Sequence, residues 1–170
     1  MKKLNLLKTA FVAIFTVVAF SCSDDDSSSQ NNTIAGIASK NPNLSSLVAA
    51  LERAELTSTL NGSGSFTVFA PTNAAFTAFL NANGFANLEA VPVPVLKQIL
   101  LNHVVSGSVQ SSQLQTGYIK TLATYGGTTS GNTLSMYVNT SAGVRLNGVS
   151  SVTTANVIAS NGVVHIVDAV

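Results

Sequence analysis

The segment SFTVFAPTNAAFTAFL, residues 65–80, constrains the fold most, because it combines the signals for a buried strand, a sharp turn and a helix. Phe66, Val68 and Phe69 supply the β-forming apolar residues of the strand. Pro71 prevents the strand from continuing, and Thr72 is well placed to cap the helix that follows. The apolar positions of that helix share one face: Ala75, Phe76, Phe79 and Leu80. The sequence therefore predicts a strand–turn–helix unit at the centre of the fold.

The start of the chain has the pattern of an export signal. Lysines 2, 3 and 8 precede the apolar run TAFVAIFTVVAF, residues 9–20, which is too short for a comfortable membrane span. The sequence Ala19-Phe20-Ser21-Cys22 contains the only cysteine and resembles a bacterial lipoprotein box, with Ala19 where leucine is usual. We expect residues 1–21 to be a lipoprotein signal peptide and Cys22 to carry the acyl anchor. The alternative is an ordinary signal peptide that leaves a free thiol.

Residues 22–32 are predicted to form a disordered tether, since they are acidic and serine-rich and contain almost no apolar surface to bury. The run Asp24–Asp26 resembles the tag that directs some Gram-negative lipoproteins to the cell surface, although it could also be a merely solubilising acidic patch. We therefore expect an exported outer-membrane lipoprotein that is exposed at the surface.

The charge of the remaining chain argues against a nucleic-acid partner. Removing the three lysines of the signal leaves five basic residues against seven acids, and no basic cluster remains to neutralise phosphates. No polybasic patch is present for anionic lipids either, so the expected membrane link is the acyl chain on Cys22.

Residues 33–170 are predicted to form one α+β domain, because helical periodicity fills the first half and short β-rich runs fill the second. Thr33 is expected to cap a short helix, which a second helix from residue 44 to about 56 follows. Pro92 and Pro94 can begin a further helix. Strands are expected at residues 118–124, 133–138, 144–146, 149–154 and 163–167, with turns at Asn147-Gly148 and Asn161-Gly162.

Three segments of this domain resemble a known family. FTVFAPTNAAF (66–76), LLNHVVSG (100–107) and NGVVHIVDAV (161–170) are similar, in order and separation, to the first box, the tyrosine–histidine box and the second box of the fasciclin (FAS1) domain. The resemblance implies a wedge of mostly antiparallel strands with helices packed around it, and an extracellular adhesion or matrix-associated role. The box residues that it assigns to structure are Phe69, Pro71, Thr72, Asn73, Phe76, His103, Asn161, Gly162, His165 and Asp168.

The chain departs from the family pattern at three places. Asn102 stands where the family often has tyrosine, and Asn156 stands where animal relatives have the acid of an integrin-recognition motif. Adhesion roles attributed to those two side chains are therefore not transferred. Family members also run further past the last aspartate, whereas this chain stops at Val170, so the final strand is expected to be short and poorly paired.

The residues that could carry chemistry are few. His103 and His165 are the only histidines, and we expect each to make a buried hydrogen bond that ties one box to the other. A zinc pair would lack a third ligand, and Asp168 should lie on the strand face opposite His165. The domain contains only four acidic residues and no G-x-S-x-G elbow. We therefore expect no catalytic residues, no metal site and no cofactor. Three exposed tyrosines (118, 125 and 137) are candidates for sugar contacts.

Two functional hypotheses follow from these observations. The first is a non-catalytic, lipid-anchored adhesion or matrix-interaction module that binds an extracellular protein or polysaccharide. The alternative is an enzyme or periplasmic assembly factor acting on envelope polymers, with His103 or His165 in the mechanism.

Overall fold

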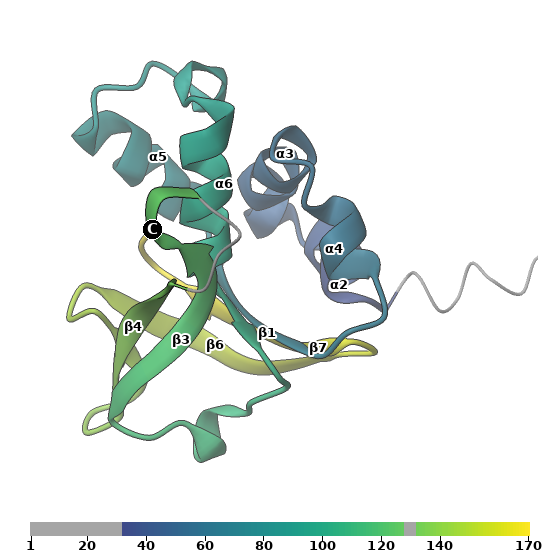
Figure 1. Cartoon of the computed structure of the whole chain (residues 1–170), viewed down its shortest axis with the longest axis vertical. Coiled ribbons are helices and arrows are strands. Elements are labelled where there is room, and N and C mark those ends of the chain that lie inside the picture. Colours follow the sequence, from purple (N-terminus) through teal and green to yellow (C-terminus); the bar gives the residue numbers. More distant parts are fainter. Residues whose placement is uncertain (1–31, 128–131) are drawn as a thin grey trace, which may run out of the picture.

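A computed structural model describes residues 32–127 and 132–170 of the 170-residue chain. The predicted signal peptide, Cys22 and nearly all of the predicted tether lie outside the described residues. The described part forms one layer of helices packed on one side of a curved sheet (Figure 1). None of the helices in these two ranges is long and apolar enough to cross a membrane.

The helices follow the expected order, with one interruption. They are α2 (Ile34–Lys40), α3 (Ser45–Arg53), α4 (Thr57–Asn61), α5 (Asn73–Ala82) and α6 (Val93–Asn102), with 3-10 turns at Pro42–Leu44, Leu88–Ala90, Ser111–Gln113 and Tyr125–Gly127. The helix expected from residue 44 to about 56 ends at Arg53 instead. Glu55 takes a left-handed conformation with φ 56, which no helix continues through, and α4 then begins as a separate helix.

Within the described residues, the strands form a single seven-stranded sheet in the order β2-β1-β7-β6-β5-β4-β3. Their bounds are β1 (Phe66–Pro71), β2 (Val104–Ser106), β3 (Gly117–Thr124), β4 (Thr133–Asn139), β5 (Arg145–Leu146), β6 (Ser150–Ala159) and β7 (Gly162–Val167). Only β1 and β7 pair in parallel; the other neighbours are antiparallel. The prediction of a mostly antiparallel α+β wedge is confirmed.

The final strand differs from the expectation of a short, poorly paired segment. β7 pairs along its whole length with β1 on one side, and on the other side it pairs with β6 at every residue except His165. β6 is longer than expected because two register shifts let it continue past residue 154. The two edge strands, β2 and β3, contact each other, so the sheet curls until its edges meet.

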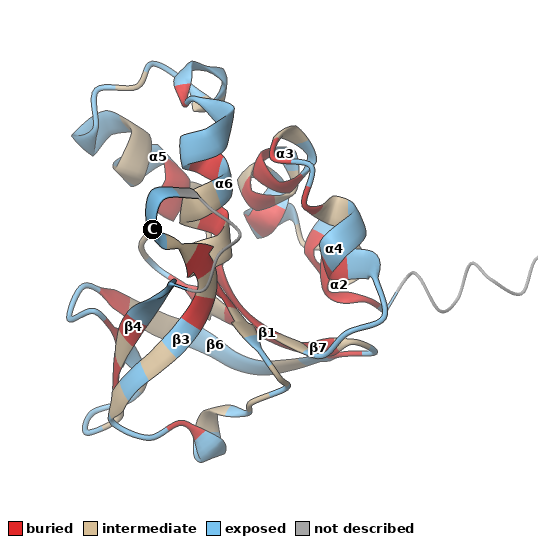
Figure 2. Ribbon diagram, in the orientation of Figure 1, coloured by how far each residue is buried: buried red, intermediate tan, exposed pale blue. Residues whose placement is uncertain are grey.

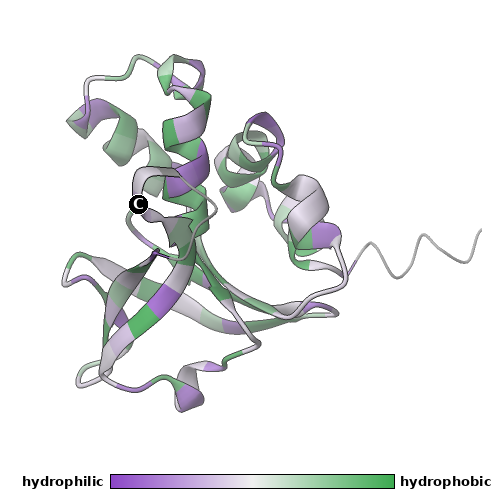
Figure 3. Ribbon diagram, in the orientation of Figure 1, coloured by the Kyte–Doolittle hydropathy of each residue, from purple (hydrophilic) through white to green (hydrophobic). Residues whose placement is uncertain are grey.

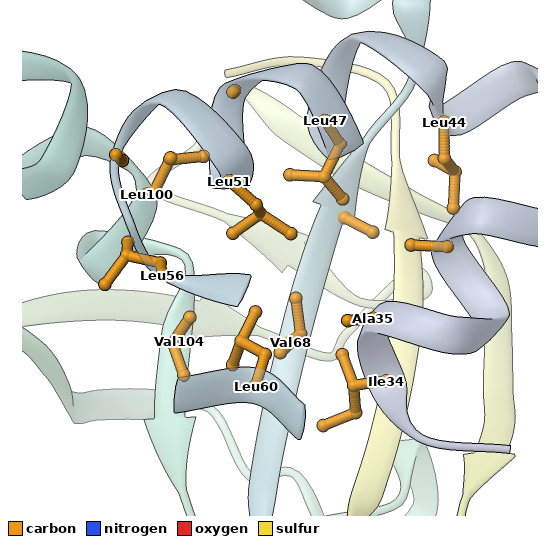
Figure 4. Packing of buried hydrophobic residues seen from close by; sticks show 14 of the residues in the cluster. Ile34, Ala35, Leu44, Leu47, Leu51, Leu56, Leu60, Val68, Leu100 and Val104 are labelled. Carbon is orange, nitrogen blue, oxygen red and sulfur yellow. The ribbon is translucent and has the colours of Figure 1, made fainter. Parts of the chain in front are cut away.

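Two apolar clusters stabilise this arrangement. The larger lies between the helices and one face of β1 and β7, where Leu47, Leu51 and Leu60 meet Val68 and Val104 (Figure 4). Buried positions therefore line the inner sides of α2, α3 and α6 (Figure 2), and hydrophobic residues fill much of these helices (Figure 3). The smaller cluster lies inside the curl of the sheet and contains Phe69, Leu114, Met136, Val138, Leu146 and Val167.

Candidate functional site

The three segments that resemble the family boxes lie side by side in the sheet. β1 runs parallel to β7 in a register that places Phe66 opposite Gly162 and Pro71 opposite Val167. The other edge of β1 pairs with β2, with Val68 opposite Val104. The Phe69 backbone N–H donates to the His103 carbonyl at 2.9 Å. This junction of β1, β2 and β7 is the structural centre of the domain.

The turn after β1 is packed into the helical layer. The Thr72 hydroxyl accepts a hydrogen bond from the Ala75 N–H at 3.2 Å, which is the expected cap of α5. The Asn73 side chain accepts from the Ser46 N–H at 2.8 Å and donates to the Pro42 carbonyl at 2.9 Å. The residue before α3 makes no side-chain capping bond. Asn73, which lies 27 residues after Ser46 in the sequence, caps the start of α3 instead. Phe76, one turn further along α5, is buried in the larger cluster.

Asn161 performs a similar role at the other end of β7. Its side-chain oxygen accepts from the Ile34 N–H at 2.9 Å, at the start of α2. Its amide donates to the Leu60 carbonyl at 2.7 Å and to the Gly62 carbonyl at 3.3 Å, at the end of α4. One side chain therefore joins the second box to two helices that lie about a hundred residues earlier in the chain.

Replacing Asn161 by alanine is expected to lower the free energy of unfolding by about 2–3 kcal/mol. The substitution removes three hydrogen bonds and leaves the Ile34 N–H and the Leu60 carbonyl without partners in a partly buried site. Urea unfolding followed by circular dichroism measures the loss.

Asn81→Ala is the matched control, because Asn81 is exposed on α5 and alanine is the better helix former. A loss at Asn161 no larger than the change at Asn81 would contradict the capping role.

Both histidines serve the fold, but not by the predicted bond between boxes. The His103 Nδ1–H donates to the Ile99 carbonyl at 2.8 Å, within the last turn of α6. His165 is fully buried; its Nε2–H donates to the Val109 carbonyl at 3.0 Å and its Nδ1 accepts from the Asn156 N–H at 3.2 Å. The expected buried hydrogen bond is present at His165, but the expected tie between boxes was wrong. Backbone pairing joins the boxes instead, while His103 bonds to its own helix and His165 to the loop that contains Val109.

Burial sets the electrostatic state of both rings. Desolvation lowers the pKa of His103 below its ordinary value of 6.5, and the hydrogen bond to Ile99 opposes this only in part. The pKa of His165 is lowered for the same reason, against the opposing hydrogen bond to Val109. The His165 ring also stacks on Phe69, with ring centroids 5.4 Å apart. Both imidazoles are therefore neutral at neutral pH.

The other box residues also have structural partners. Pro71 is the buried last residue of β1. Asp168 is exposed just beyond β7, and its carboxylate accepts from the Ser151 N–H at 2.6 Å. The exposed Asp168 and the buried His165 do not form an acid–base pair. In the part of the chain that the structure describes, no three His, Cys, Asp or Glu side chains come together as a metal site.

Comparison with known proteins decides the family. The family model of the Fasciclin domain matches residues 42–170, which is most of the chain. The chain belongs to the fasciclin domain family. It is 38% identical over 138 residues to Protein sll1483 of Synechocystis sp., a match that covers 81% of this chain and 72% of that protein. It is 37% identical over 142 residues to Immunogenic protein MPB70 of Mycobacterium bovis, covering 81% of this chain and 67% of that protein.

Two further matches are more limited. The chain is 42% identical over 86 residues to the cell surface glycolipoprotein MPB83 of Mycobacterium bovis, covering 48% of this chain and 38% of that protein. A solved FAS1 domain pair from the insect cell adhesion molecule Fasciclin I superposes with a TM-score of 0.65 at 18% identity, covering 81% of this chain and 50% of that one. At that identity the superposition shows a shared fold.

In this fasciclin domain, Asn156 has a structural role that the sequence did not reveal. It takes a left-handed conformation with φ 61 at a register shift of β6. Its side chain accepts from the Ser111 N–H at 2.8 Å and donates to the Ser111 hydroxyl at 2.9 Å. Asparagine tolerates a left-handed backbone better than most residues do, so its presence at position 156 was the one sequence signal for this conformation. Asn156 thus fastens the loop before β3 onto β6.

The same loop borders a cavity that sequence reasoning also missed. The cavity has a volume of about 330 Å³ and lies where the two edge strands of the curled sheet meet. Its inner wall includes Phe69, Val105 and Ile119, and its outer rim includes Gln115 and Tyr118. We call it the edge cavity. Its walls come from segments about fifty residues apart, so no local pattern in the sequence predicts it.

Proposed function

We propose that this chain is a non-catalytic, lipid-anchored adhesion or matrix-interaction module that binds an extracellular protein or polysaccharide. In this proposal residues 1–21 direct export, Cys22 carries the acyl chain, and residues 22–32 hold the fasciclin domain of residues 33–170 away from the outer membrane. The acidic run Asp24–Asp26 sends the protein to the cell surface.

Family membership is the observation that carries the proposal. Among the related fasciclin proteins, MPB83 is named a cell surface glycolipoprotein, and the superposed FAS1 pair belongs to a protein named a cell adhesion molecule. A lipid-linked module at the cell surface is consistent with both names.

The positions of the histidines argue against the enzymatic alternative. An envelope-polymer enzyme or assembly factor would need His103 or His165 as its acid or base. His165 is fully buried and uses both ring nitrogens, and the Nδ1 of His103 is held by the carbonyl of its own helix. His165 therefore has no free ring nitrogen for general acid–base catalysis. His103 is only partly buried, but among the described residues no acidic one that could act with it lines the cavity that it borders.

Deleting residues 33–170 while retaining the leader and tether is expected to reduce cell aggregation and attachment to matrix-coated surfaces. Microscopy of bound cells and sedimentation of cell suspensions measure the change. Cys22→Ala in the full-length protein is the companion variant, since it keeps the domain and removes the anchor. Unchanged attachment of the deletion strain on several surfaces would overturn the proposal, as would polymer turnover by the purified protein that disappears in His103→Ala.

A further inference from the structure

The edge cavity is bordered by a loop, residues 107–116, that the fold holds in place. The Thr67 hydroxyl donates to the Gly107 carbonyl at 2.6 Å and accepts from the Val109 N–H at 2.9 Å. His165 and Asn156, already described, hold the Val109 carbonyl and Ser111. Because these bonds anchor the loop to β1, β6 and β7, the cavity is formed before any ligand arrives, which lowers the entropic cost of binding.

An exposed tyrosine, Tyr118, borders this cavity and is held by a half-buried second tyrosine, Tyr137, which does not line it. Tyr118 on β3 and Tyr137 on β4 are directly opposite in the strand register, with ring centroids 5.2 Å apart. Tyr118 is a large hydrophobic residue that is nevertheless 78% exposed. A tyrosine held by a neighbouring ring offers a broad, rigid contact surface at low conformational cost.

The chemistry of the cavity selects among ligands. No residue that lines it is charged, so a charged ligand would lose its hydration there without gaining a partner. The inner wall of Phe69, Val105 and Ile119 is apolar, whereas the rim carries the amides of Gln113 and Gln115. Apolar walls with a few polar groups are typical of a small-molecule site of this volume. A neutral sugar combines apolar C–H faces with hydroxyl groups and matches both parts.

We propose that the edge cavity and the Tyr118–Tyr137 pair bind a neutral polysaccharide, with one sugar ring stacked on Tyr118 and its hydroxyls hydrogen bonded to the amides of Gln113 and Gln115. The inference rests on the adhesion function proposed above and names the class of its ligand. A uronic acid polymer would bring unpaired carboxylates to the cavity, and a fatty acyl chain would use its apolar wall but not the amides.

The test is calorimetric titration of the full-length protein, kept in a detergent without a sugar headgroup. The neutral probes are hexaoses of glucose, mannose and galactose; hexagalacturonate and dodecanoate represent the acidic sugar and the acyl chain. We expect a neutral hexaose to bind and the other two probes not to bind. Since the chain contains no tryptophan and only three tyrosines, binding should also change the tyrosine fluorescence directly.

Tyr118→Ala is expected to weaken hexaose binding about tenfold or more, whereas Tyr118→Phe retains the ring and the affinity. Tyr125→Ala is the matched control, because Tyr125 is 75% exposed and lies outside the edge cavity. Equal effects at Tyr118 and Tyr125, no binding of any neutral hexaose at millimolar concentration, or a preference for hexagalacturonate or dodecanoate would overturn the proposal.

The two proposals fail in different ways. If deleting residues 33–170 lowers attachment but no neutral hexaose binds, the adhesion function stands and the assignment of the cavity is wrong. If a hexaose binds through Tyr118 but the deletion strain attaches normally, the cavity assignment stands and the adhesion function is wrong.

Discussion

Gly162→Ala is expected to destabilise the domain by at least about 3 kcal/mol or to prevent folding. A Cβ at this position would lie 1.9 Å from the Phe66 carbonyl oxygen and 2.9 Å from the Phe66 nitrogen, and the backbone φ of 151 is unfavourable for a side chain. Phe66 cannot move aside easily, because its strand also pairs with β2 and its N–H donates to the Asn161 carbonyl. Separating the strands would break the parallel β1–β7 pair at the centre of the sheet.

Gly148→Ala is the matched control for this prediction. Gly148 also has a positive φ, +71, but a Cβ there would meet no atom within 4 Å. Its replacement should cost only the backbone strain of a left-handed alanine, about 1 kcal/mol. Urea unfolding of both variants separates the two contributions; equal losses would show that the contact with Phe66 is not what makes glycine necessary at 162.

Local signals in the sequence predicted most of the secondary structure. Thr33 and Thr72 cap the helices that they were expected to cap, and both side chains accept the backbone N–H three residues later. Pro71 ends β1, and Asn147-Gly148 forms the turn between β5 and β6 with φ values of 51 and 71. These features depend on a few adjacent residues, which is why a single sequence reveals them.

The features that the sequence did not reveal depend on contacts between distant segments. The early end of α3 depends on the left-handed Glu55, for which glutamate gives no signal. The pairing of residues 65–80 with residues 161–170 was expected from the family resemblance, but its parallel direction, between segments about a hundred residues apart, has no local signal. In the sequence, Asn73 and Asn161 look like ordinary turn residues. In the structure, their side chains cap α3 and α2, which lie elsewhere in the chain. The partners of the two histidines were predicted wrongly, because we expected side-chain hydrogen bonds to join the boxes. In the structure, backbone hydrogen bonds between the strands join them.

Acidification below pH 6.5 is expected to destabilise the domain through both histidines. In the unfolded chain each ring binds a proton near its ordinary pKa of 6.5, whereas burial lowers the pKa of both rings in the folded protein. As the pH falls from 6.5 toward the folded pKa values, the unfolded state binds more protons, so stability decreases by up to about 1.4 kcal/mol per pH unit for each histidine. Above about pH 7 both states are neutral, and the contribution of the two histidines does not change with pH.

For His165, the loss of stability on protonation has a direct structural cause. Its Nδ1 accepts the Asn156 N–H, so a proton on that nitrogen would face another donor and break the bond at the loop before β3. The measurement is urea unfolding between about pH 7.5 and about pH 5, above the range in which ordinary carboxyl groups titrate. His165→Gln and His103→Gln are each expected to remove part of the slope, whatever their effect on absolute stability, and the double variant should remove most of it. A double variant that keeps the full slope would place the acid sensitivity in other groups.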